Sequence, residues 1–227
     1  MSQSSRPGLT RDVIIQTALR LLGDTGLDGL TVRRLAAGLG VQSPALYWHF
    51  RSKQDLLDGM ADAIITATGM SPPRAGESWQ HWLARRARAY RRSLRAHRDG
   101  ARIITSARAL SPATVKTFDQ ELAILVSRGF TPVLALRTIA ALTRYVNGFV
   151  LQEQASSHPD AAPPPDQFAA FAGSDDGAPA TLLQAIRDGG SLLSDQAFEH
   201  GLRVIIDGTA IALTNQHPSH GPPTPPD

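Results

Sequence analysis

Apolar residues recur every three or four positions along most of the 227-residue chain, with polar residues between them. This spacing places the apolar side chains on one face of an α-helix. We therefore predict an all-α protein. The expected helices cover residues 10–25, 32–39, 44–50, 53–68, 77–97, part of 99–110, 111–126, 131–155 and 195–216.

The stretch from Leu30 to Lys53 predicts two short helices joined by a tight turn. The first, Val32–Leu39, has one apolar stripe, and Gly40 behind it can take the left-handed conformation that ends a helix. Ser43 is expected to cap the second helix, Pro44–Phe50. Two helices in this order form a helix-turn-helix, whose second helix can enter a DNA major groove.

The second of these helices is too short to bury all of its aromatic side chains. Tyr47, Trp48 and His49 follow one another on it. Four cations bracket this aromatic cluster: Arg33, Arg34, Arg51 and Lys53. An ordinary helical hairpin is the alternative, but the combination of aromatic and basic side chains favours DNA binding.

Charge is unevenly distributed along the chain. Residues 1–108 contain 17 Lys and Arg against 8 Asp and Glu, whereas residues 109–227 contain 6 against 12. A basic first half indicates a nucleic-acid surface there. Part of this charge is an arginine run between residues 85 and 98, which we predict to be the solvated face of a helix.

The composition argues against several classes of protein. Cysteine is absent, the start of the chain has no apolar leader, and no run of about 18 apolar residues could span a membrane. No catalytic or phosphate-binding motif occurs. We expect a cytoplasmic protein that is not an enzyme and needs no cofactor or metal, with a mobile loop at 156–181 (a short helix at 167–171) and a disordered tail at 217–227.

Residues 43–64, SPALYWHFRSKQDLLDGMADAI, resemble the TetR family of bacterial transcriptional repressors, and in particular its tetracycline-repressor branch. The sequence LYWHF followed by K-x-x-LL is a specific signal. Further similar segments are GESWQHWL at 76–83, AHRDGARI at 96–103, RGF at 128–130 and GFVLQEQ at 148–154.

The resemblance implies two domains. A helix-turn-helix domain would cover residues 1–52, and an effector-binding and dimerisation domain would cover 53–216. The helix from Lys53 would join the two, so that a shift in the second domain moves the first. Helices 131–155 and 195–216 would pair with their copies in a homodimer as a four-helix bundle.

The resemblance also implies which residues contact double-stranded operator DNA. Arg33 could bind a guanine edge, Tyr47 and Lys53 could hold phosphates, and Pro44 and Ala45 could meet thymine methyl groups. Because Ser43 and Ala45 differ from the glutamine and threonine of the tetracycline repressor, we expect a different operator. The full set is Thr31, Val32, Arg33, Ser43, Pro44, Ala45, Tyr47, Trp48, His49 and Lys53.

A pocket for a small-molecule effector follows from the same resemblance. Taken singly, each position is more often a core residue than a ligand contact; together they are the best candidates. They are Arg86, Tyr90, Ile104, Ala107, Phe118, Glu121, Leu122, Leu136, Ile139, Thr143 and Gln152.

The predicted pocket differs from that of the tetracycline-repressor branch at the positions that support a metal ion. Ile104 replaces a histidine and Gln152 replaces a glutamate that support the magnesium of bound tetracycline, and Glu153 is expected to point elsewhere. Isoleucine supplies no donor to a hard cation. Arg86 replaces an asparagine, so we expect a flat, partly aromatic effector without metal, with an anionic or acceptor group for Arg86.

The sequence therefore predicts a repressor that a small molecule releases from a palindromic operator. Three alternatives remain open at this stage. They are activation instead of repression, a DNA-binding protein without a small-molecule response, and an all-helical enzyme or carrier.

Overall fold

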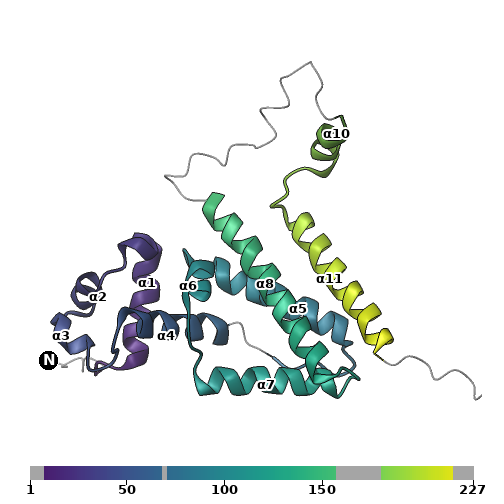
Figure 1. Ribbon diagram of the computed structural model, residues 1–227. Helices are drawn as coiled ribbons and strands as arrows, with labels where there is room; N and C mark the ends of the chain where they lie inside the picture. The colour runs from purple at the N-terminus through teal and green to yellow at the C-terminus, as the bar shows by residue number, and fades with distance from the viewer. Residues whose placement is uncertain (1–7, 68–70, 157–179, 217–227) are drawn as a thin grey trace, which may run out of the picture.

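The computed structural model describes residues 8–67, 71–156 and 180–216, and within them the chain forms ten helices and no strand (Figure 1). The prediction of an all-α fold is confirmed. In chain order the helices are α1 (Arg11–Gly29), α2 (Val32–Leu39), α3 (Ser43–Leu46), α4 (Lys53–Thr66), α5 (Trp79–Arg95), α6 (Gly100–Ser106), α7 (Pro112–Val126), α8 (Pro132–Ser156), α10 (Ala180–Gly189) and α11 (Asp195–Asn215).

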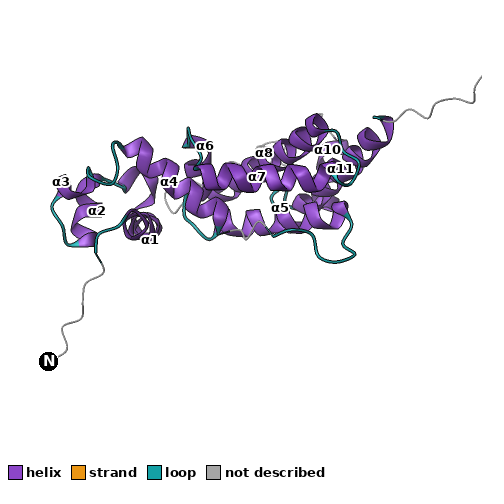
Figure 2. Ribbon diagram, turned by 90° about the horizontal axis from the view of Figure 1, so that it is seen from below, coloured by secondary structure: helices purple, strands orange, loops and turns teal. Residues whose placement is uncertain are grey.

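Helices α1, α2 and α3, which we call the head, pack around a small apolar core at one end of the molecule (Figure 2). Thr10 caps α1 through a hydrogen bond from the Val13 amide, and Gly26 kinks it at φ 66°. Gly40 ends α2 in the left-handed conformation, as predicted. Leu35 from α2 and Leu46 from α3 are buried.

Helix α3 is shorter than predicted. It ends at Leu46 instead of Phe50, and residues 47–49 form turns. Ser43 is not the cap that we expected: it is the first helical residue, and Gln42 precedes it without a side-chain capping bond. The segment nevertheless has two apolar anchors, since Leu46 and Phe50 are both buried. Those two anchors hold the segment in place although its hydrogen bonding is not helical throughout.

Helices α5 to α11 form the body, and α4 runs between head and body (Figures 1 and 2). Helix α5 packs against α8, and α11 and α7 pack on α8 from different sides. The most deeply buried side chains of this core include Trp82, Leu94, Leu142 and Phe198. The core therefore joins elements that lie more than a hundred residues apart in sequence.

The arginine run on α5 is not simply a solvated face, so that prediction is wrong for its inner members. Arg91 is buried, and its guanidinium forms ion pairs with Glu153 of α8 and Asp195 of α11. The same guanidinium lies 4.3 Å from the centre of the Phe198 ring. Arg88, more exposed, pairs with Glu199 of α11 at 2.6 Å. These arginines fasten α5 to the helices beside it.

Helix α10 was not predicted. It follows directly on the Pro- and Gly-rich stretch and is only ten residues long. The predicted loop at 156–181 is wrong at its ends, since residue 156 belongs to α8 and residues 180 and 181 belong to α10. Its remainder, 157–179, with the predicted short helix at 167–171, and the predicted tail at 217–227 lie outside the described residues. Among the described helices, none is long and apolar enough to cross a membrane.

Candidate functional site

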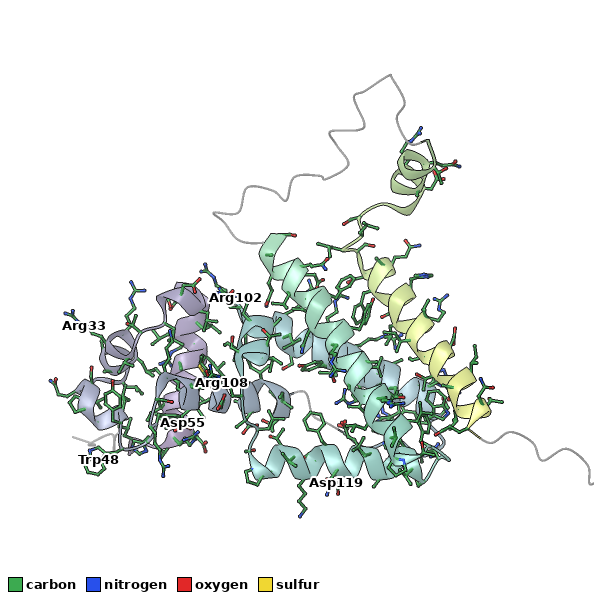
Figure 3. The ribbon with its side chains drawn as sticks, viewed as in Figure 1. Arg33, Trp48, Asp55, Arg102, Arg108 and Asp119 are labelled. Carbon is green, nitrogen blue, oxygen red and sulfur yellow. The ribbon has the colours of Figure 1, made fainter. Side chains whose placement is uncertain are left out.

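The outer end of the head carries the exposed aromatic and basic side chains. Trp48 is 89% exposed and Tyr47 is 59% exposed, although both are large and partly apolar. Figure 3 shows Arg33 and Trp48 projecting from the head on the side away from the body. Within the described residues, the side chains of Arg33 and Lys53 form no hydrogen bond or ion pair, so both are free to bind an anion.

The other predicted DNA-contact residues lie close by, at the start of α2 and on α3. The Thr31 hydroxyl accepts a hydrogen bond from the Arg34 amide at 3.2 Å, so it is committed to capping α2. Pro44 is exposed, whereas Val32, Ser43, Ala45 and His49 are half-buried. The structure thus brings the predicted set together, but with unequal access to a ligand.

Arg11 holds this surface against the rest of the head. Its guanidinium donates to the His49 carbonyl at 3.0 Å and to the Asp55 carboxylate at 2.6 Å, and it lies 4.3 Å from the centre of the Phe50 ring. The hydrogen bond from Arg11, and a weaker one from the Arg51 amide, keep the pKa of Asp55 below its ordinary range. Sequence reasoning missed Arg11 because its partners are 38 to 44 residues away.

A partly open cavity of about 250 Å³ lies between the body and α4. It lies among five helices, and its lining is mainly apolar. The lining residues are Ile65 of α4, Arg86 and Tyr90 of α5, Ile104 of α6, Phe118 of α7, Thr143 of α8, and residues 107–110 of the segment between α6 and α7.

Six of the predicted pocket residues line this cavity. They are Arg86, Tyr90, Ile104, Ala107, Phe118 and Thr143. Leu122, Leu136 and Ile139 instead line a groove of about 260 Å³ between α7 and α8, which shares Phe118 and Thr143 with the cavity. Glu121 borders a third hollow, and Gln152 is exposed and lines none of them.

Sequence reasoning missed Ile65 and residues 108–110 of the cavity wall. Ile65 continues the apolar face of the predicted helix from Lys53, which was the one available signal for it. The segment after α6 carries no periodic pattern, so nothing in the sequence placed it against the cavity.

Two of the polar side chains that line the cavity, Arg86 and Tyr90, are already paired. Arg86 and Glu121 form a two-pronged ion pair, with Nε to Oε1 at 2.7 Å and Nη2 to Oε2 at 2.8 Å. The Tyr90 hydroxyl donates to Asn147 Oδ1 at 2.8 Å, and burial raises the pKa of Tyr90 to about 12. Arg86 is therefore not the free cation that we expected, because Glu121 neutralises it.

The donor set does not fit a magnesium ion. Ile104 presents only hydrocarbon to the cavity, and the exposed Gln152 lies outside its lining. Glu153 faces Arg91 instead. Across the described residues, no three His, Asp or Glu side chains gather as a metal site would require. Since Mg²⁺ needs oxygen ligands, this lining could not hold the ion.

One wall of the cavity is bonded to the helix that carries the head. The end of α6 and the segment that follows it bond three α4 side chains. Gln54 donates to the carbonyl of Ser106, the last residue of α6, at 2.8 Å, and Asp58 accepts from the Arg108 amide at 2.9 Å. Asp62 accepts from the Ser111 amide at 2.9 Å. A molecule that displaced this segment would therefore act directly on α4.

A second junction links the end of α1 to the start of α6. The Leu27 amide donates to the buried Asp99 carboxylate at 2.8 Å, and Arg102 pairs with Asp28 at 3.1 Å. Asp99 has a φ of 57°, which is uncommon for a residue other than glycine. The head is thus attached to the body at two places, α4 and this corner.

Two family models match the chain. The model of the bacterial regulatory proteins of the tetR family matches residues 14–60. The model of the tetracyclin repressor-like C-terminal domain matches residues 72–213. The first match covers the head and part of α4, and the second covers nearly the whole body.

Known proteins resemble the chain over most of its length. It is 40% identical over 201 residues to the tetracycline repressor protein class C of Escherichia coli, covering 88% of this chain and 90% of that protein. The solved structure of a possible TetR family transcriptional regulator from Streptomyces coelicolor A3(2) has a TM-score of 0.77 at 35% identity, covering 89% and 99% of the two chains. That of TetR (class A) in complex with 5a,6-anhydrotetracycline and magnesium has a TM-score of 0.65 at 36% identity, covering 89% and 99%.

Proposed function

The chain belongs to the TetR family of bacterial regulatory proteins, and on this basis we propose that it is a homodimeric repressor which a metal-free small molecule releases from a palindromic operator. The observation that carries the proposal is that one wall of the cavity is bonded to α4, the helix that joins the head to the body. Residues 107–110 line the cavity, and Ser106, Arg108 and Ser111 within and beside this segment bond α4. A ligand that binds better when this segment has moved shifts the population of head positions.

For the DNA contacts we propose the roles that the exposed residues suit chemically. Arg33 has a free guanidinium, which can bind a guanine edge through two hydrogen bonds. Tyr47 and Lys53 can hold phosphates and set the position of the head along the duplex. The Arg11 contacts with His49 and Asp55 keep these groups in place without occupying them.

For dimerisation we propose the outer faces of α8 and α11. Val133 and Leu136 on α8, and Val204 and Ile211 on α11, are between 56% and 65% exposed. Large apolar side chains gathered on one face are typical of an interaction surface. Their position supports the four-helix bundle that the resemblance implies.

For the effector we propose a flat, partly aromatic molecule that binds without a metal ion. Tyr90 and Phe118 offer ring faces and edges, and Ile104 and Ile65 add apolar surface. TetR (class A) has been solved with 5a,6-anhydrotetracycline and magnesium. Burying that ion beside Ile104, with Glu121 already paired to Arg86, would leave its charge poorly compensated.

A gel-shift titration with tetracycline tests this proposal. The DNA is the fragment upstream of the chain's own gene, and the titration is run once with magnesium and once with a chelator. We expect no release by tetracycline in the presence of magnesium at concentrations that saturate a tetracycline repressor. Release that requires magnesium would show that the cavity does hold the chelate and would overturn the metal-free proposal.

A further inference from the structure

The two arginines that line the cavity differ in whether a carboxylate neutralises them. Arg86 and Glu121 neutralise each other, and their side chains are only 11% and 4% exposed. Arg108 also lines the cavity, and within the described residues its side chain has no hydrogen bond or ion pair. Figure 3 shows Arg108 in the segment between α6 and α7, beside the helices of the head. As far as the described residues show, the cavity lining thus has one uncompensated cation, and it belongs to the segment that is bonded to α4.

An unpaired guanidinium next to an apolar cavity selects for a particular kind of ligand. Arg108 is exposed, and its fixed fork of donors matches carboxylate, sulfonate and phosphate groups, with which it forms charge-assisted hydrogen bonds that are stronger than neutral ones. The aromatic and aliphatic side chains deeper in the cavity offer nothing to a second charge. A molecule with one anionic group and an apolar ring system therefore fits both the Arg108 guanidinium and the apolar lining.

We propose that the effector is an aromatic monoanion whose acid group binds Arg108 while its rings lie against Tyr90, Ile104 and Phe118. The inference rests on the proposed function and deepens it, because it names the chemical class of the effector. It also moves the anion contact from Arg86, where the sequence suggested it, to Arg108.

The position of Arg108 gives the anion a direct effect on the head. The Arg108 amide donates to Asp58 of α4, and the segment on both sides of it is bonded to Gln54 and Asp62 of the same helix. A ligand that draws the Arg108 side chain into the cavity pulls on the backbone that these α4 side chains hold. Anion recognition and the signal to the head thus occur in one segment.

Arg144 provides a matched control. It is also exposed, also without a hydrogen bond or ion pair among the described residues, and it lines the neighbouring groove between α7 and α8. Replacing either arginine by glutamine removes the same formal charge. Of these two arginines, only Arg108 lines the cavity.

Two fluorescent probes that share one ring skeleton test the inference. 8-Anilinonaphthalene-1-sulfonate carries an acid group, whereas N-phenyl-1-naphthylamine lacks it, and both brighten in apolar sites. We expect the full-length protein to bind the sulfonate about tenfold more tightly than the neutral probe. Arg108→Gln should bring that ratio close to one, and Arg144→Gln should leave it unchanged. Ile104→Trp, which fills the cavity, should abolish binding of both probes.

The outcomes separate this inference from the proposed function. Equal affinities of the parent for the two probes, an unchanged ratio in Arg108→Gln, or full binding by Ile104→Trp would each overturn the inference. Circular dichroism of each variant verifies that it is folded, so that a lost ratio cannot reflect unfolding. Operator binding by the parent, followed by fluorescence anisotropy, is measured in parallel: if it is present while the probes bind alike, only the anion inference fails.

Discussion

At the scale of single residues, the nearly buried pair of Arg86 and Glu121 shows how a neighbour changes what a side chain can do. The resemblance placed Arg86 at the pocket, and the structure places it there. Its partner comes from α7, 35 residues later, and takes both prongs of the guanidinium. No local pattern in the sequence indicates such a pair, because it depends on how two helices cross.

Replacing one member of this pair should lower the free energy of unfolding far more than replacing both members. Glu121→Leu leaves Arg86 as a buried charge without a partner, and we expect a loss of about 3–5 kcal/mol in the free energy of unfolding. The double variant Arg86→Met, Glu121→Leu should recover most of that loss. Urea denaturation of the parent, both single variants and the double variant measures it. Additive losses would mean that the two side chains are not coupled.

The exposed side chains of the head should divide into two classes by their effect on DNA binding. Tyr47→Ala and Lys53→Ala should weaken binding to all sequences alike, since phosphate contacts carry no base information. Arg33→Ala should weaken the free energy of operator binding by about 1–3 kcal/mol and should also relax base preference. Anisotropy titrations against the operator and single-base variants distinguish the classes. An Arg33→Ala protein that keeps the parental affinity and preference would show that the proposed docking is wrong.

At the scale of elements, most helix positions could be predicted from apolar spacing and caps, and the exceptions have physical reasons. Thr10, Thr31 and Ser111 cap α1, α2 and α7 by accepting hydrogen bonds from backbone amides of the first turn. Helix α3 ends early because its last residues are held by buried anchors and by Arg11, which the local pattern does not show. The local pattern predicted a solvated face for the inner arginines of α5. Their acidic partners lie on α8 and α11, far away in the sequence, so the pattern could not show them.

The Arg11–Asp55 contact should make the head sensitive to acid. The hydrogen bond from Arg11 lowers the pKa of Asp55 from its ordinary value of 3.8. Because the folded pKa lies below the unfolded one, the contact stabilises the head fully above the unfolded pKa and is lost as the pH falls through the folded pKa. Asp55→Asn should therefore lower the melting temperature at pH 7, and the difference from the parent should shrink below about pH 4.

Thermal melts of parent and variant from pH 7 down to pH 3 measure this effect. Asp12→Asn is the control, since Asp12 is an exposed aspartate on the same helix as Arg11 and makes no hydrogen bond within the described residues. A constant difference between Asp55→Asn and the parent over the whole range would contradict the role given to this ion pair.

At the scale of the whole molecule, the helices form two functional ends joined by α4 (Figure 2). The family resemblance predicted this plan, and the family matches over residues 14–60 and 72–213 support it. The attachment of the 106–111 segment to α4 could not be predicted, because it depends on backbone amides meeting the carboxylates of Asp58 and Asp62. In the mechanism proposed above, that attachment couples the cavity in the body to the DNA-binding surface of the head.

The most direct test of the account is footprinting of the DNA upstream of the chain's own gene. We predict a two-fold symmetric protected region whose half-sites are about 10–10.5 bp apart, or a multiple of that distance, because two heads related by a dimer axis must each enter a major groove. Val204→Glu combined with Ile211→Glu places charges on the proposed dimer face and should abolish the footprint while leaving each chain folded. A single asymmetric protected half-site, or an undiminished footprint from this monomeric double variant, would contradict the account.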